Sequence, residues 1–249
     1  MRLLCLFMLV CLMACKKNVN GPATPVDPVD TVTPLFLVKK QTVINHNGGR
    51  LVEKYFYDAM GRVVRTEGEG GFYDYVVVYY YSDGSFLKHY TTPVLNQVEW
   101  HRLNADSLVD SIIRMEMPQG AVIGDTMNYT GLEYSPDGSF VRRIYNAQKQ
   151  LIETDSLVYK AGNCVSTSYS GIISRNYAFT YDLTRKTTTE GVNIGMRYFR
   201  SNRNALTSIT YATGSSASFV NQYDRDARQD TIRVFSNGKP DKTLCYEYY

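Results

Sequence analysis

The sequence predicts an all-β protein, an antiparallel β-meander of many hairpins that curls into a barrel-like or open-sided sheet. From Leu35 to the end, no stretch shows the 3.6-residue hydrophobic period of a helix. Tyr, Thr and Val, which suit a pleated sheet, are abundant, and the 249 residues include 21 Tyr. Short β-rich runs alternate with turn clusters, a pattern that a parallel α/β fold would not show.

Residues 1–14 form a signal peptide rather than part of the fold. Arg2 provides a basic start, and Leu3–Met13 is an apolar run too short to span a bilayer. The run ends in LMAC, so that Ala14 precedes Cys15. This pattern resembles a bacterial lipoprotein signal, which implies cleavage before Cys15 and fatty acylation of that cysteine, with palmitate as a typical chain. The alternative is an ordinary secretory signal that contains a cysteine by chance.

Residues 15–34 comprise the lipidated cysteine and a proline-rich tether. Lys16–Pro34 contains four prolines and no aromatic residue, so it cannot bury enough apolar surface to fold. As a polyproline II helix it would reach up to ~60 Å. Related lipoproteins destined for the cell surface often carry acidic residues here, but this chain has Lys16 and Lys17. We therefore expect a cell-envelope protein held in the outer membrane by its lipid, facing the periplasm rather than the surface.

Residues 35–249 form one antiparallel β domain. About fifteen turn clusters rich in Asp, Asn and Gly divide it, and their spacing predicts strands of about 8–10 residues. The domain also repeats itself, because YSDGSF at 81–86 matches YSPDGSF at 134–140, and ADSLVDS at 105–111 matches TDSLVYK at 154–160. We interpret these matches as a duplicated block of hairpins.

The stretch 55–67, YFYDAMGRVVRTE, shows how the turns are built. Asp58 can accept backbone N–H groups just ahead of it, and Gly61 can take a positive φ without steric cost. We therefore assign both residues a structural role rather than a catalytic one. The same turn motif is expected at Asp83 with Gly84, Asp137 with Gly138, and Asn237 with Gly238.

These motifs carry a family resemblance. YFYDAMGRVVRTE, YSPDGSF and QYDRDARQDTIRVF resemble degenerate YD repeats, the hairpin units of Rhs-type and teneurin shells. The whole arrangement of lipoprotein signal, tether and Tyr-rich hairpins resembles Bacteroidota lipoproteins that bear a domain of unknown function described as porin-like. The resemblance covers nearly all of the mature chain. It implies a β-meander curling towards a barrel, and it implies no known activity.

No group of residues predicts an enzyme, a metal site or a cofactor. The sequence has no G-x-S-x-G motif, and His46, His89 and His101 are too widely spaced to indicate zinc, so we expect them at the surface. The small net charge of +3 is dispersed and argues against nucleic acid as a partner. A glycan-directed hydrolase with dispersed carboxylates remains the alternative. We expect its candidate acids to be solvated: Glu99, Glu116, Glu133, Glu153 and Asp155.

Two further features leave alternatives open. Cys164 and Cys245 remain after removal of the signal and lipidation, and we favour two buried thiols over a disulfide. The strands have the length of those in membrane barrels, but charges on both strand faces, as at Arg142 and Arg143, favour a barrel in water.

Aromatic residues give the best indication of a binding site. The run FYDYVVVYYY at 72–81 is apolar on both faces, which predicts a strand covered on both sides. Trp100 lies between Glu99 and His101, a composition that suits stacking on a sugar, although a core position is the alternative. We name Trp100, Tyr79 and Tyr81 as candidate ligand contacts. The function predicted is a non-catalytic binding or scaffolding module for a protein or glycan, with a purely structural spacer as a further alternative.

Overall fold

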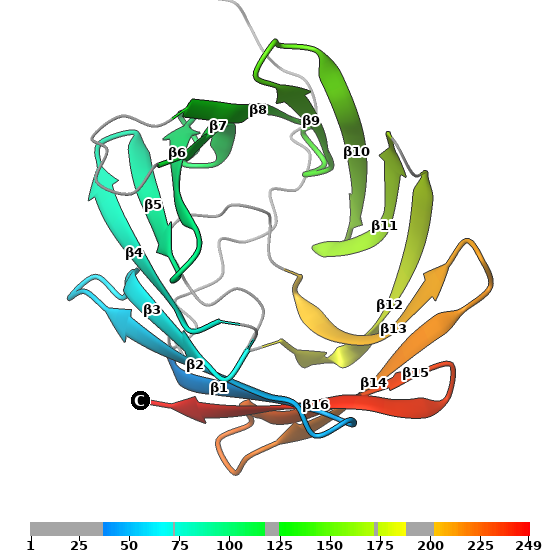
Figure 1. Cartoon of the computed structure of the whole chain (residues 1–249). Helices are drawn as coiled ribbons and strands as arrows, with labels where there is room; N and C mark the ends of the chain where they lie inside the picture. The colour runs from blue at the N-terminus through cyan, green and yellow to red at the C-terminus, as the bar shows by residue number, and fades with distance from the viewer. Residues whose placement is uncertain (1–36, 72, 118–124, 172–173, 188–201) are drawn as a thin grey trace, which may run out of the picture. The chain divides into compact units, whose positions relative to one another are not determined.

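The computed structural model describes residues 37–71, 73–117, 125–171, 174–187 and 202–249, which contain sixteen β-strands and no helix. The expected signal peptide and tether, including Cys15, lie outside these residues. Each strand pairs antiparallel with the next one along the chain (Figure 1). The strands are β1 (Val38–Asn45), β2 (Arg50–Tyr57), β3 (Val63–Glu69), β4 (Tyr75–Ser82), β5 (Ser85–Thr91), β6 (Asn96–Leu103), β7 (Val109–Glu116), β8 (Asp125–Tyr134), β9 (Phe140–Asn146), β10 (Leu151–Lys160), β11 (Asn163–Ser170), β12 (Arg175–Lys186), β13 (Asn204–Tyr211), β14 (Ser216–Tyr223), β15 (Gln229–Ser236) and β16 (Lys239–Tyr248).

The sheet closes into a barrel because β16 returns to pair with β1. Thr42 lies opposite Cys245, and an ion pair joins Lys40 to Glu247 across the seam. Closure gives every strand two neighbours and leaves the wall without an open edge. The all-β meander is thus confirmed, and of the two forms expected from the sequence the chain adopts the closed one. Sixteen strands ~4.8 Å apart and tilted by ~40° make a wall roughly 30 Å across.

The two faces of the wall are distinguished by the core. Phe86 of β5, Val109 of β7, Phe140 of β9 and Tyr159 of β10 belong to one buried hydrophobic cluster. Side chains from strands this far apart in the meander can meet only on the concave side of the wall, which we call the inner face. Because successive residues of a strand alternate in direction, the neighbours of these residues lie on the outer face.

Tyrosines fasten one end of the barrel. Strands alternate in direction, so the turns after even-numbered strands lie at the same end as Leu37 and Tyr249, and we call this end the terminal rim. Near it, five tyrosine hydroxyls donate hydrogen bonds to carbonyls at the start of the preceding strand. They are Tyr57 to Val38, Tyr81 to Val63, Tyr134 to Val109, Tyr181 to Cys164, and Tyr248 to Gln229, at 2.6–2.8 Å.

The β2–β3 turn shows what the Asp and Gly of these motifs do. Asp58 Oδ1 accepts the N–H groups of Met60 and Arg62 at 2.9 Å each, and Gly61 has a φ of 75°. The Nε of Arg62 donates to Asp58 Oδ2 at 2.7 Å, and its guanidinium lies 4.4 Å from the centre of the Tyr81 ring. The arginine therefore connects the turn to a rim tyrosine of the next hairpin.

The β14–β15 turn repeats this arrangement. Asp224 Oδ1 accepts the N–H of Arg228 at 2.9 Å, and the Arg228 guanidinium lies 4.8 Å from the Tyr248 ring centre. Here Ala227 adopts the positive φ, at 60°, that Gly61 adopts in the other turn. The other motifs predicted as turns also lie in turns, with positive φ at Gly84, Gly138, Asn237 and Gly238 and with Asp137 accepting the N–H of Ser139.

Only part of the predicted duplication has a structural counterpart. Tyr81 and Phe86 flank the β4–β5 turn as Tyr134 and Phe140 flank the β8–β9 turn, with ring centres 5.8 and 5.3 Å apart. The second match differs, because residues 105–111 span the β6–β7 turn whereas residues 154–160 lie within β10. The local sequence is shared, but its position relative to a turn is not.

Two expectations about burial are wrong. The run 72–81 was expected to be covered on both sides, but β4, which contains its residues 75–81, has an exposed outer face on which Tyr80 is 56% exposed. Cys164 is buried as expected, but Cys245 is only partly buried, and both thiols are free. Cys245 lies on β16 at the outer face, opposite Thr42, where a neighbouring strand covers it on each side but no second layer does.

Candidate binding surface

Seven large side chains form a row on the outer face. They lie directly opposite one another across seven consecutive strands, β4 to β10, in the order Tyr80, Leu87, Trp100, Ile113, Tyr129, Tyr145 and Leu151. We call this row the apolar stripe. Tyr80, Trp100 and Leu151 are 56%, 39% and 54% exposed. A second outer row of Val78, His89, Val98 and Met115 lies beside it.

Local geometry explains why the stripe begins where it does. The two-residue turn of Asp83 and Gly84 connects β4 to β5, which places Tyr80 opposite Leu87. Direct pairing then continues through Trp100 to Ile113, because the bulge of the β6–β7 pair comes later, between Arg102 and Leu103. The row therefore depends on turn lengths that keep alternate residues in register over several hairpins.

The structure separates the three predicted ligand contacts. Trp100 belongs to the apolar stripe on the outer face, whereas Tyr79 and Tyr81 lie on the inner face with their rings stacked 6.5 Å apart. Glu99 and His101, the neighbours of Trp100 in sequence, also point inward. The polar groups expected beside the indole are therefore on the other side of the wall, and its cross-strand neighbours are Leu87 and Ile113.

The inner face carries a buried charged cluster centred on Glu99. One carboxylate oxygen, Oε1, accepts from Arg114 Nη2 at 2.6 Å and Nε at 2.9 Å. The other, Oε2, lies 3.3 Å from His101 Nε2 and 3.4 Å from Lys88 Nζ. The His101 ring stacks on Phe86, with centroids 4.3 Å apart and planes 8° apart. The histidine thus joins the ionic cluster to the hydrophobic core.

Glu99 and His101 shift each other's pKa. Burial, the largest effect, raises the pKa of Glu99, but the hydrogen bond from His101 and the charges of Lys88, Arg114 and His101 outweigh it and hold that pKa at about 2. Burial lowers the pKa of His101, and the two nearby cations add to this, against the opposing effect of Glu99. The cluster therefore favours an ionised Glu99.

A second buried ion pair lies on the inner face of β9 and β10. Arg142 donates from Nε to Asp155 Oδ2 at 2.6 Å, and its Nη2 lies 3.6 Å from Glu153. Burial raises the pKa of Glu153, and the adjacent Asp155 carboxylate adds to the effect. The expectation that the candidate acids are solvated is therefore wrong for Glu99 and Asp155, which are buried, and it holds for Glu116 and for the strongly exposed Glu133.

The three histidines lie in different environments. His46 lies in the β1–β2 turn at the surface, and His89 lies on the outer face and contacts Asn96 at 2.5 Å. His101 is buried, contrary to the expectation of a surface position, because its ring fills the space beside Phe86. Within the residues that the structure describes, no three His, Cys, Asp or Glu side chains converge as metal ligands.

Tyrosines and a glycine shape the inner face near β2 to β4. Glu53 accepts hydrogen bonds from the hydroxyls of Tyr55, at 3.0 Å, and Tyr75. Burial raises the pKa of both phenols, and the Glu53 carboxylate reinforces the shift. The Tyr75 ring lies directly against Gly68 of β3, where any Cβ would collide with it. The absence of a side chain at Gly68 is what lets Tyr75 reach Glu53.

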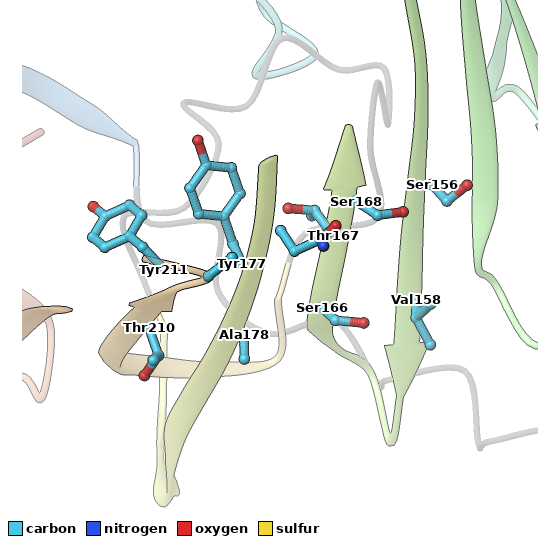
Figure 2. A pocket seen from close by; sticks show the side chains of 11 residues that line it. Ser156, Val158, Ser166, Thr167, Ser168, Tyr177, Ala178, Thr210 and Tyr211 are labelled. Carbon is cyan, nitrogen blue, oxygen red and sulfur yellow. The ribbon is translucent and has the colours of Figure 1, made fainter. Parts of the chain in front are cut away.

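A groove of about 410 Å³ lies on the outer face across β10 to β13 (Figure 2). Figure 2 shows the rings of Tyr177 and Tyr211 pointing away from Ala178 and Thr210. The groove therefore presents small side chains, several with hydroxyl groups, and these two rings are not available for stacking. Its outer-face lining consists of Ser156, Val158, Ser166, Ser168, Asn176, Ala178 and Thr210.

Comparisons with known proteins identify the fold. No family model and no curated protein sequence matches the chain. A crystal structure of a porin-like protein from Bacteroides uniformis is 11% identical with a TM-score of 0.63, and the match covers 85% of this chain and 96% of that chain. A porin-like protein from Bacteroides vulgatus is 12% identical with a TM-score of 0.62, covering 86% and 99%. The porin-like fold implied by the resemblance is confirmed, while the lipoprotein signal and the YD repeats remain predictions.

Sequence reasoning missed the apolar stripe, although part of its signal was present. The two-residue turn at Asp83 and Gly84 places Tyr80 opposite Leu87 by symmetry alone. Extending the row needs the bulges between later strands, for example between Arg114 and Met115. These irregularities have no clear local signature in the sequence, so only the first pair of the stripe, Tyr80 and Leu87, could be predicted from it.

Proposed function

We propose that this protein is a non-catalytic binding module of the bacterial cell envelope that docks a partner protein through the apolar stripe. The observation that carries the proposal is the stripe itself, with a second row beside it that is apolar except for His89. Soluble proteins seldom leave a contiguous apolar area of this kind uncovered unless it binds something. The stripe contains one Trp and three Tyr, and these are among the side chains that contribute most at protein interfaces.

Charge on the outer face favours a wall that lies in water. Lys54, Arg65, Arg143 and Arg233 occupy the middle of strands β2, β3, β9 and β15 on that face. A positive charge at the centre of a bilayer costs ~2–4 kcal/mol in a membrane barrel. Four such positions around the wall are incompatible with lipid on all sides, so the proposal places the barrel beside a membrane rather than across it.

The surroundings of Trp100 favour a protein over a glycan as the partner. Its cross-strand neighbours are Leu87 and Ile113, whereas the side chains of Glu99 and His101 lie on the inner face of the wall. Sugar recognition needs hydrogen-bonding groups around the ring. The groove of Figure 2 has such groups, but its two tyrosine rings point away from it.

Location in the envelope is supported by the sequence and by the fold neighbours. The lipoprotein-like signal predicts a lipid on Cys15, and the two solved structures compared above are porin-like proteins of Bacteroides. We propose that the lipid anchors the protein in the outer membrane, with the barrel on the periplasmic side. The tether would then allow the stripe to reach partners up to ~60 Å from the membrane.

One observation favours a second candidate function, a glycan-directed hydrolase. Glu153 and Asp155 are adjacent inner-face carboxyl groups, and the pKa of Glu153 is raised, as a general acid requires. Asp155 is fully buried and held by Arg142, however, and neither acid lines the groove of Figure 2. Release of reducing sugar from envelope glycans, lost in Glu153→Gln, would establish this function in place of the first.

Site-specific photo-crosslinking in cells tests the proposed function. A photoreactive amino acid replaces Leu87 of the stripe or, as a matched control, Val220, which is 49% exposed on the outer face of β14. We expect a discrete protein adduct from position 87 that is absent from position 220 and is lost when Trp100→Ser is added. Equal adducts at both positions, or none at either, would refute a docking role for the stripe.

A further inference from the structure

The stripe crosses the wall obliquely and is narrow. Seven directly paired residues on adjacent strands span six strand spacings, or ~29 Å. The row begins at Tyr80, near the terminal rim, and ends at Leu151, the first residue of β10 at the opposite end of the barrel. Together with the second row, it offers roughly 500–700 Å² of exposed apolar surface, somewhat less than each partner contributes to a standard protein interface.

The closed wall restricts the conformation of a partner. A peptide that binds as an extended strand needs a sheet edge with free N–H and C=O groups. Here β1 and β16 pair with each other, so the described wall provides no such edge. A segment that covers the apolar stripe gains no backbone hydrogen bonds from the wall, which favours a segment that pairs its own N–H and C=O groups over an extended one. An α-helix pairs these groups internally, and its width of ~10–12 Å matches one or two rows of side chains.

The margin of the stripe disfavours a lipid surface. Interfacial binding to anionic membranes relies on unpaired Lys and Arg beside the apolar residues. The arginines beside Trp100 and Tyr145 are already neutralised: Arg102 pairs with Asp110 at 2.8 Å, and Arg143 pairs with Glu133 at 2.6 Å. A margin of paired charges suits the mixed-charge flanks of an amphipathic helix and gives anionic lipid no net attraction.

A second copy of the chain fits the stripe poorly. The row wraps around a convex wall roughly 30 Å across. Two such walls touch only near the middle of each stripe, leaving Tyr80 and Leu151 at the ends uncovered. A single helix is slender enough to lie along the row, and its longer side chains can reach the ends.

We propose that the apolar stripe docks an amphipathic α-helix of a partner protein, about 19 residues long at 1.5 Å per residue. The inference rests on the proposed function and specifies its partner. The apolar face of the helix covers Trp100, Ile113 and Tyr129 in the centre of the stripe. Its charged flanks lie against the Arg102–Asp110 and Arg143–Glu133 pairs.

Intrinsic fluorescence tests the inference, because Trp100 is the only tryptophan of the chain. The full chain is titrated with a synthetic tryptophan-free 20-residue peptide that has Leu on one helical face and alternating Glu and Lys on the other. We expect a saturable blue shift of Trp100 emission. A scrambled peptide of the same composition, and one with two central prolines, should bind at least tenfold more weakly.

Matched variants locate the binding site. The double variant Leu87→Ser, Tyr129→Ser should abolish the shift, whereas Val220→Ser, on the outer face of β14, should leave it unchanged. Far-ultraviolet circular dichroism shows that each variant keeps its β structure. Equal binding of the scrambled peptide, or no shift with the helix at millimolar concentration, would overturn the inference.

Two further titrations test the other possible ligands of the stripe, a membrane and a second copy of the chain. A blue shift with neutral or anionic phospholipid vesicles but not with the helix would assign the stripe to a membrane. A shift that depends only on protein concentration would assign it to a second copy. If the adduct from position 87 persists in cells while the helix fails to bind, the proposed function stands and the helical partner is wrong; loss of both refutes the proposed function as well.

Discussion

Replacing Glu99 by Gln tests whether the inner charged cluster stabilises the barrel. Gln keeps the size of the side chain and removes its charge. Arg114 and Lys88 would then face the inner wall without their anion, and His101 would lose its ionic partner. Because the Glu99 side chain is only 8% exposed, water cannot fully replace the lost interactions.

The pKa of Glu99 sets the magnitude. It is held at about 2 in the folded protein instead of the ordinary 4.5. At 1.36 kcal/mol per pKa unit, the ionised carboxylate contributes roughly 3 kcal/mol to the free energy of unfolding at neutral pH. We therefore expect Glu99→Gln to lower this free energy at pH 7 by roughly 3 kcal/mol, measured by urea denaturation followed by circular dichroism.

The effect has a definite dependence on pH. A carboxylate with a depressed pKa contributes its full stability above its unfolded pKa of 4.5 and loses it as the pH falls through about 2. The contribution of the Glu99 carboxylate to the difference between the wild-type protein and Glu99→Gln should be nearly constant from pH 7 to pH 5 and fall by more than half at pH 3. His101, whose pKa is lowered from 6.5, adds a loss of stability below pH 6.5, and this loss is larger in Glu99→Gln because Glu99 no longer opposes the shift.

A control distinguishes burial from ion pairing. Glu133 also pairs with an arginine, Arg143 at 2.6 Å, but its side chain is 71% exposed on the outer face. Glu133→Gln should leave the denaturation midpoint unchanged. If Glu99→Gln is as stable as the wild-type protein at pH 7, or if the difference between them is the same at pH 7 and pH 3, the cluster does not stabilise the fold in the way its geometry indicates.

Three other substitutions or measurements test the wall. Gly68→Ala should lower the free energy of unfolding by about 1–3 kcal/mol, because the added Cβ displaces Tyr75 from Glu53. Gly131→Ala is the control: the space around Gly131 is open, so this substitution should leave thermal unfolding unchanged. Residues 61 and 227 both have positive φ, which favours Gly over Ala. Gly61→Ala should therefore lower the free energy of unfolding by about 1 kcal/mol, and Ala227→Gly should raise it by a smaller amount; a change of the same sign in both variants would contradict this. Maleimide should label Cys245 in the folded protein and Cys164 only after unfolding, and a disulfide between these two cysteines would refute the pairing of strands.

The fold was predictable because its signals are local. Asp58 and Gly61 mark a turn by themselves, and the alternation along β12, where Tyr177, Phe179 and Tyr181 face inward, needs only a period of two. Closure was not predictable in this way. It depends on Lys40 meeting Glu247 across the whole length of the domain, and neither residue differs from an ordinary surface charge in the sequence.

The candidate surface was less predictable than the fold because it depends on register. In β4 both faces are apolar, so the sequence could not tell whether Tyr79 or Tyr80 faces the core. Trp100 was recognised as a candidate contact, but its sequence neighbours were mistaken for its spatial neighbours. On a strand, the residues beside a side chain come from adjacent strands, here Leu87 and Ile113, and not from positions 99 and 101.

The distribution of side chains around the outer face argues for a partner of limited size. Strands β4 to β10 carry large apolar residues, whereas β11 to β13 carry small ones at outer positions, such as Ser166, Ala178 and Ser208. A bilayer that surrounded the barrel would require apolar residues on every strand. A wall that faces water alone has scattered apolar residues but seldom a continuous row of them. Other strands carry single exposed apolar residues on the outer face, Ile44, Phe56 and Val220, but these lie opposite Arg50, Arg65 and Arg233 rather than in a row. A continuous apolar row confined to seven strands fits the footprint of a single docked segment.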